Sequence, residues 1–293
     1  MERTSTKRVS DDILSTSSSL CGSSLSPKEN EIKKKESVEK EELEPLVDYL
    51  LKEEMKPYNT AYEPLYNHEI DTIERTNAVD WIMEGCTICK FSDTSLFRSI
   101  KLMDHFLARS QKPVPPDSLN LLALSAFVLA TKYEEICSFT PQVTSDQLDQ
   151  KYSLFQILQY QLKILTQLKF RIGFPTLLDF ICCFAQELHS PSASLLLQLA
   201  IYMGKMTLLE DGFSGVKTSM IAFGCIWAAN RFYSGKQEPE KEQPSLISEV
   251  AFKGLVKKAG YDFDNITMIS IPVLDTASDF DEANELQSIL KRY

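Results

Sequence analysis

Two ten-residue segments of almost purely apolar sequence constrain the fold of this chain more than any other feature. Within residues 121–130 only Ser125 is polar, and residues 220–229, which begin 99 positions later, carry no charge. A helix that is apolar on every side has to be buried at the centre of a bundle. The sequence therefore predicts two copies of one helical unit, each built around a buried central helix.

Amphipathic stripes around the two segments repeat at the same distance. Apolar residues recur there at spacings of three and four, which is the period of one helix face. The matching positions are Val79 and Leu178, Ile82 and Ile181, Cys86 and Ala185, Leu96 and Leu195, and Ile100 and Leu199. These stripes predict helices that wrap the central ones, with Asp93 as the N-cap of the second. The chain is therefore predicted to be all-α.

Composition and periodicity divide the chain into four parts. The first is rich in Ser, Thr, Lys and Glu and has no aromatic residue, so it predicts a disordered regulatory tail. The second contains one amphipathic helix and a linker, and the two helical units follow. The predicted boundaries are 1–42, 43–71, 72–172 and 173–293. Pro272 is expected to weaken the last helix of the second unit.

Charge and composition exclude several classes of function. The net charge of −10 repels phosphate backbones, which disfavours a nucleic-acid-binding protein. No stretch approaches the roughly 18 apolar residues of a membrane span, and no apolar signal segment opens the chain. Seven cysteines without regular pairing are expected to be reduced thiols. We predict residence in the nucleus and cytoplasm, without membrane association.

Motifs for catalysis or cofactor binding are not found in the sequence. Cys86 and Cys89 have the spacing of a metal or redox pair, but no second cysteine pair accompanies them. Both lie on the apolar stripe of a predicted helix, so buried packing is the preferred interpretation. The three histidines are far apart, and no Gly-rich phosphate loop is present. We expect no catalytic residue, metal or cofactor, and a protein as the partner.

Short motifs resemble those of the cyclin family, in the order and at the spacing found there. The matching segments are residues 49–55, 75–81, 102–107, 131–135, 204–208 and 255–261. Together they resemble the N-terminal helix and the two cyclin boxes of A- and B-type (mitotic) cyclins. The similarity covers about residues 43–266.

This resemblance implies two tandem five-helix cyclin boxes and a regulatory role. A chain of this kind binds and activates a cyclin-dependent serine/threonine kinase in cell-cycle control, by holding the αC helix of the kinase in its active position. It does no chemistry itself. The alternative is a divergent cyclin-fold scaffold or adaptor that binds partners without activating a kinase.

The resemblance also assigns roles to individual residues. Those implied to face the kinase are Lys132, Glu134, Glu135 and Leu158. Leu158 is placed where kinase-activating cyclins carry a glutamate that works with the lysine, which keeps the scaffold alternative open. A neutral acceptor from Gln156, Gln159 or Gln161 is the other possibility at this position. Arg75 and Asp104 are implied to form an internal ion pair between the first two helices.

A substrate-docking groove is implied at Trp81, Glu84 and Asn120. Three neighbouring positions, where bulky apolar residues are usual in the family, are occupied instead by Glu74, Asn77 and Ala78. These substitutions argue against a working groove.

The predicted tail contains a candidate destruction signal. Lys28-Glu29-Asn30 resembles the KEN box that targets mitotic regulators to the anaphase-promoting complex, and a charge-rich linker is the alternative interpretation. Ser26 precedes Pro27 and is a candidate proline-directed phosphosite beside it.

Overall fold

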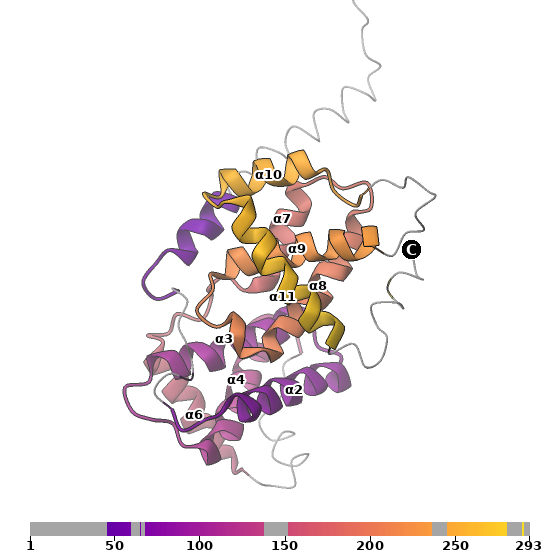
Figure 1. The fold of residues 1–293 in the computed structure, drawn as a ribbon. Helices are drawn as coiled ribbons and strands as arrows, with labels where there is room; N and C mark the ends of the chain where they lie inside the picture. Colours follow the sequence, from indigo (N-terminus) through magenta and orange to yellow (C-terminus); the bar gives the residue numbers. More distant parts are fainter. Residues whose placement is uncertain are drawn as a thin grey trace, which may run out of the picture. The chain divides into compact units, whose positions relative to one another are not determined.

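The computed structural model of the protein describes residues 46–59, 65, 68–137, 152–235, 245–279 and 289. Every regular element among these residues is a helix, which confirms the all-α prediction (Figure 1). No helix in this part of the chain is long and apolar enough to cross a membrane. The predictions for the tail, at Ser26 and at Lys28, Glu29 and Asn30, fall outside the described residues.

The first helical unit is built around α4. A helix over residues 46–54 precedes the unit, and its own elements are α2 (Thr72–Cys89), α3 (Asp93–Arg109), η1 (Pro116–Ser118), α4 (Leu119–Glu134) and α6 (Leu154–Gln167). The α4 helix contacts α2, α3 and α6, and it is buried without interruption from Leu122 to Thr131. This is the central helix that the apolar segment predicts.

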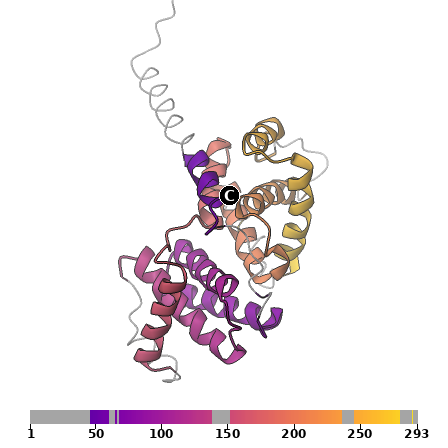
Figure 2. The same cartoon turned by 90° about the vertical axis from the view of Figure 1, so that its left-hand side faces the viewer.

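The second unit repeats this arrangement around α9. Its elements are α7 (Leu177–Glu187), α8 (Ala193–Leu209), η2 (Asp211–Phe213), α9 (Thr218–Gly235), α10 (Glu249–Lys258) and α11 (Phe263–Asp279). The α9 helix contacts α7, α8 and α11. Figure 2 shows the helices of the first unit, in magenta, as one group and those of the second, in orange to yellow, as another.

A glycine allows a close helix crossing in the second unit. A Cβ atom placed on Gly224 of α9 would lie 2.7 Å from Cγ2 of Ile269 on α11, which is too close for two carbon atoms. Glycine is therefore required at this position by packing rather than by backbone conformation, and the central helix can approach α11 directly.

The structure corrects two predictions about helix ends. Ser92, not Asp93, is the N-cap of α3, and Asp93 is the first helical residue. The carboxylate of Glu135, delivered from the end of α4, binds the Ser92 N–H in place of a local cap. Pro272 lies inside α11 without ending it, because Pro272 is on the exposed side while Val273 and Ala277 hold the other side in the core.

Candidate partner-binding surface

Lys132, in the last turn of α4, is held by a neutral side chain of α6. Its ammonium donates a hydrogen bond to Oε1 of Gln161 at 3.0 Å, and Gln161 is only 5% exposed. The position whose side chain binds Lys132 is therefore Gln161 rather than Leu158, which is 45% exposed. A shift of three residues keeps a helical stripe nearly in phase, so the sequence pattern does not separate the two positions.

The charge of Lys132 has no carboxylate beside it among the described residues. Partial burial lowers the pKa of Lys132, and no neighbouring acid raises it again. Because a lysine can only donate, the amide oxygen of Gln161 must face it, which turns the amide nitrogen the other way. That nitrogen, Nε2, is buried and has no hydrogen-bond partner in the described part of the structure.

Apolar side chains are exposed next to this polar pair. Phe155, Leu158 and Leu162 follow one another at helical spacing along α6, and all three are exposed to solvent. Tyr133, adjacent to Lys132 on α4, is exposed as well. An exposed apolar row of this kind is typical of a surface that binds another protein.

A hollow of about 570 Å³ adjoins Tyr133. Its lining includes Tyr58, Phe170 and Gly173. Phe170 has a φ of 59°, a left-handed conformation that is unusual for an aromatic residue, and it is exposed. A Cβ atom at Gly173 would meet the Tyr133 hydroxyl at 2.6 Å, so the absence of a side chain there makes room for the tyrosine.

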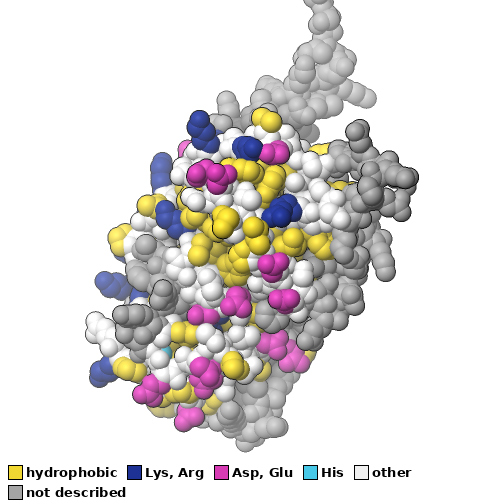
Figure 3. All heavy atoms as spheres, in the orientation of Figure 1, with side chains coloured by type: hydrophobic (Ala, Val, Ile, Leu, Met, Phe, Trp, Pro, Cys, Tyr) yellow, Lys and Arg dark blue, Asp and Glu magenta, His cyan; other side chains and the backbone are white. Residues whose placement is uncertain are grey.

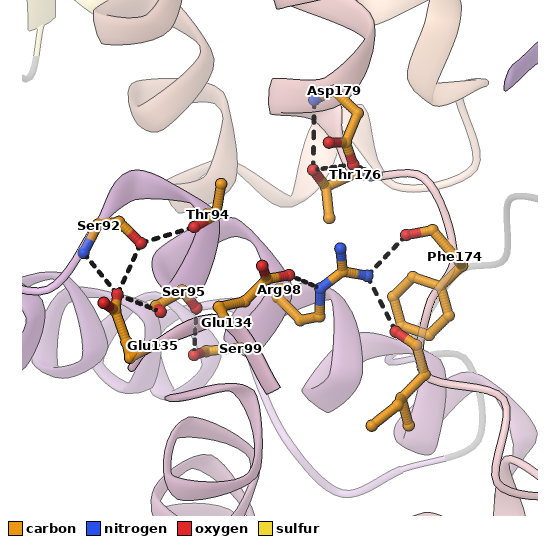
Figure 4. Close-up of polar contacts among 11 residues, drawn as sticks. Ser92, Thr94, Ser95, Arg98, Ser99, Glu134, Glu135, Phe174, Thr176 and Asp179 are labelled. Carbon is orange, nitrogen blue, oxygen red and sulfur yellow. Dashed lines mark hydrogen bonds and ion pairs between the residues drawn. The ribbon is translucent and has the colours of Figure 1, made fainter. Parts of the chain in front are cut away.

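The carboxylates of Glu134 and Glu135 are bound within the first unit, as Figure 4 shows. Glu134 forms an ion pair with Arg98, whose Nη1 also donates to the carbonyls of Ile172 and Phe174 at 2.9 and 2.7 Å. Arg98 therefore ties the end of α4 to the segment that leads into the second unit. The kinase-facing role that the resemblance implies for Glu134 stays a prediction beside this internal ion pair.

Glu135 binds the beginning of α3. Its Oε1 accepts hydrogen bonds from the Ser92 N–H at 2.8 Å and from the Ser95 hydroxyl at 2.7 Å. Burial acts to raise the pKa of Glu135, but the hydrogen bonds from Ser92 and Ser95 outweigh it and lower the pKa. A carboxylate at a helix N-terminus also complements the helix dipole. Glu135 thus fixes the beginning of α3, and its implied kinase-facing role stays a prediction.

Arg75 and Asp104 form a bidentate ion pair between α2 and α3. Arg75 Nε and Nη2 donate to the two carboxylate oxygens of Asp104 at 3.0 and 2.7 Å. The same guanidinium donates from Nη1 to the carbonyl of Leu208 at 2.9 Å, at the end of α8. The pair therefore joins the two helical units as well as two helices of the first, which the sequence did not indicate.

A buried carboxylate at the start of α9 was also missed by sequence reasoning. Glu54 ends the helix over residues 46–54, and its Oε1 accepts a hydrogen bond from the Ser219 N–H at 2.8 Å. Glu54 is buried, and the Ser219 hydroxyl binds it too. The N-terminal helix thus supplies the cap of the second central helix. No local motif signals this contact, because the two residues are far apart in sequence.

The residues of the implied docking groove lie on α2 and α4. Trp81 is half-buried and packs edge-on against Phe127, with ring centroids 6.1 Å apart. Glu84 and Asn120 are exposed. Glu74 completes a capping box with Asp71 at the start of α2, which gives this residue a structural use. Of the other two neighbouring positions, Ala78 is buried and Asn77 is exposed.

The cysteine pair of α2 carries free thiols. Burial raises the pKa of Cys86 to about 12, so its thiol is protonated and unreactive at neutral pH. Cys89 is half-buried and also free. In the ranges that the structure describes, no group of three His, Cys, Asp or Glu side chains is placed to hold a metal ion.

Comparisons with known proteins give consistent matches along the chain. The family model of the cyclin N-terminal domain matches residues 26–173, and that of the cyclin C-terminal domain matches residues 175–279. Cyclin-A2-1 of Arabidopsis thaliana is 27% identical over 179 residues, which covers 60% of this chain and 40% of the relative. Cyclin-A1 of Xenopus laevis is 32% identical over 185 residues, covering 62% and 43%. The chain thus spans less than half the length of these two relatives.

Among solved structures, a viral cyclin from herpesvirus saimiri superposes with a TM-score of 0.65. The superposition covers 80% of this chain and 96% of the viral chain, and the two sequences are 15% identical. At this level of identity the likeness concerns the fold.

Proposed function

The chain belongs to the cyclin family, and we propose that it is a non-catalytic subunit that binds and activates a cyclin-dependent serine/threonine kinase. The family models that cover both helical units support this role, as do the A-type cyclins among its relatives. Action in mitosis, residence in the nucleus and cytoplasm, and turnover through Lys28-Glu29-Asn30 and the anaphase-promoting complex belong to the same proposal. No nucleic acid or membrane is part of it.

The observation that carries the proposal is the ammonium of Lys132, held by Gln161 at the edge of an exposed apolar row. In this proposal the row of Phe155, Leu158 and Leu162 packs against the αC helix of the kinase, and Lys132 donates to acceptors beside that helix. Such contacts stabilise the active position of αC, in which the ion pair between the catalytic lysine of the kinase and its αC glutamate is complete.

Co-purification of a kinase tests this proposal. Lys132→Met keeps the apolar stem but removes the charge, so it should reduce the recovered kinase and its activity at least tenfold, because a charge-assisted bond at a desolvated interface contributes about 2 to 5 kcal/mol. The thermal melt should not change. The matched control is Lys163→Met, which removes an exposed cation that lies over the Tyr160 ring on α6. Recovery of an active kinase at wild-type level with Lys132→Met would place the docking surface elsewhere.

One observation favours the alternative of a scaffold that binds without activating. The side chain beside Lys132 is an amide, where the family resemblance implies a carboxylate. A scaffold would recover a kinase whose activity towards a peptide substrate stays at the basal level, or would recover other proteins and no kinase. Measuring kinase activity and identifying the bound proteins in the same pull-down separates the two functions.

A further inference from the structure

We infer that the kinase selected by this chain places a carboxylate against Lys132, and that Gln161 is the residue that sets this preference, an inference that rests on the proposed kinase-binding role. The preference follows from the charge of Lys132, which no carboxylate among the described residues compensates, next to the exposed apolar row of α6. The inference concerns which kinase the chain selects. The docking surface is the one proposed above.

The amide at position 161 makes the difference because it matches a carboxylate in shape but not in charge. Gln161 Oε1 orients the Lys132 ammonium at 3.0 Å without neutralising it. A glutamate in the same place would form an internal ion pair and would present a neutral pair to the partner. With glutamine, one full positive charge remains for the partner to satisfy.

The acidic residues closest in sequence are not free to neutralise Lys132. Glu134 is paired with Arg98, and Glu135 is held by Ser92 and Ser95 at the start of α3. Both carboxylates are therefore directed into the first unit (Figure 4). If either carboxylate left its place, the buried side chain of Arg98 or Ser95 would lose its partner, which would lower the free energy of unfolding.

The overall charge of the protein opposes the binding of an acidic partner. The net charge of the chain is −10, and Figure 3 shows Asp and Glu side chains spread over the part of the first unit that α2 forms. A general negative field repels acidic partners, so a partner carboxylate must be attracted at one defined point. Lys132 provides that point.

The exposed apolar row strengthens the selection when the partner binds. Phe155, Leu158 and Leu162 exclude water from the surroundings of Lys132 once a second surface covers them. An attraction between two unit charges grows severalfold when the effective dielectric constant falls from that of water to about 20. A partner without an acceptor for the cation would bury an unpaired charge, so it is rejected.

The test measures how tightly charge variants of α6 bind the kinase that the wild-type chain co-purifies. For this assay the kinase is expressed on its own. The dissociation constant is measured at about 50 and about 300 mM NaCl, because ion pairs with a partner weaken as salt rises. Gln161→Glu should weaken binding at least tenfold at low salt and remove most of the salt dependence. Gln161→Met, which keeps the charge of Lys132 uncompensated, should keep the salt dependence. The matched control is Gln159→Glu, which adds the same charge at an exposed position of α6 and should change affinity less than threefold.

A second measurement identifies the partner group. Carboxylates on the αC side of the kinase are changed one at a time to amides, and one of them should weaken wild-type binding while having no effect on Gln161→Glu. Thermal melts of all variants establish that they are folded. Equal affinity and equal salt dependence of wild type and Gln161→Glu would overturn the inference and leave the kinase-binding role intact. Recovery of no kinase by the wild-type chain would overturn both.

Discussion

Substitution of Arg75 is the clearest test of how the two units are joined. Arg75 is only 4% exposed, and its guanidinium holds the Asp104 carboxylate and the Leu208 carbonyl at the same time. Arg75→Met fills most of the same space and removes all three hydrogen bonds. Asp104 then keeps its charge without a partner.

The size of the effect follows from this burial. Removing one member of a buried ion pair costs about 3 to 5 kcal/mol. The Asp104 side chain is 23% exposed, so water can reach the stranded carboxylate, and we expect the lower end, about 3 kcal/mol. For a folded body of this size, about 1 kcal/mol shifts the melting temperature by about 2 to 4 °C, so the melt should fall by about 6 to 12 °C.

Calorimetry of Arg75→Met, Asp104→Asn and the double variant measures the coupling between the two side chains. The control is Lys253→Met, because the ion pair of Lys253 with Glu249 is exposed on both sides and is expected to contribute less than about 0.5 kcal/mol. A melting temperature of Arg75→Met that matches the Lys253→Met value would refute a buried, stabilising role for the pair.

Two further predictions concern the second unit and the pH dependence of stability. Gly224→Ala should destabilise the fold by about 1 to 3 kcal/mol, since its Cβ would meet the stiff side chain of Ile269, whereas Gly254→Ala in α10, which has open space around it, should be neutral or stabilising in urea unfolding. Equal effects of the two substitutions would contradict the close crossing of α9 and α11. Burial lowers the pKa of Lys101 from 10.5 to about 8, so between these values the unfolded chain binds the proton and the folded chain does not. The contribution of Lys101 to the free energy of unfolding should therefore rise with pH over that range, by up to about 1.4 kcal/mol per unit, whereas the buried thiol of Cys86, whose pKa burial raises, acts in the opposite direction in both proteins. The difference between the wild-type and Lys101→Met profiles isolates the lysine and should rise with pH; parallel profiles of the two proteins would refute it.

The sequence alone was sufficient for the features that depend on local periodicity. The central helices α4 and α9 are apolar on every side over about ten residues each, which is too short for a membrane span, so the interior of a bundle is the environment that accommodates them. Their repetition at one offset predicted two similar units, and the motifs around Arg75 and Lys132 identified the cyclin family. These inferences hold because helix formation and burial are set by residues within a few turns of one another.

Tertiary structure alone decided which side chains meet. Helical periodicity is nearly unchanged by a shift of three residues, so only the packing of α6 on α4 distinguishes Gln161 from Leu158 as the partner of Lys132. The resemblance implied that Glu134 and Glu135 face a kinase, and only the tertiary structure shows that Arg98 and Ser95 of α3 bind their carboxylates. The contacts of Arg75 with Leu208 and of Glu54 with Ser219 join residues 133 and 165 positions apart, and no local pattern encodes such pairs. They form because buried helix ends leave backbone groups unpaired, and any charged side chain that packing brings within reach binds them.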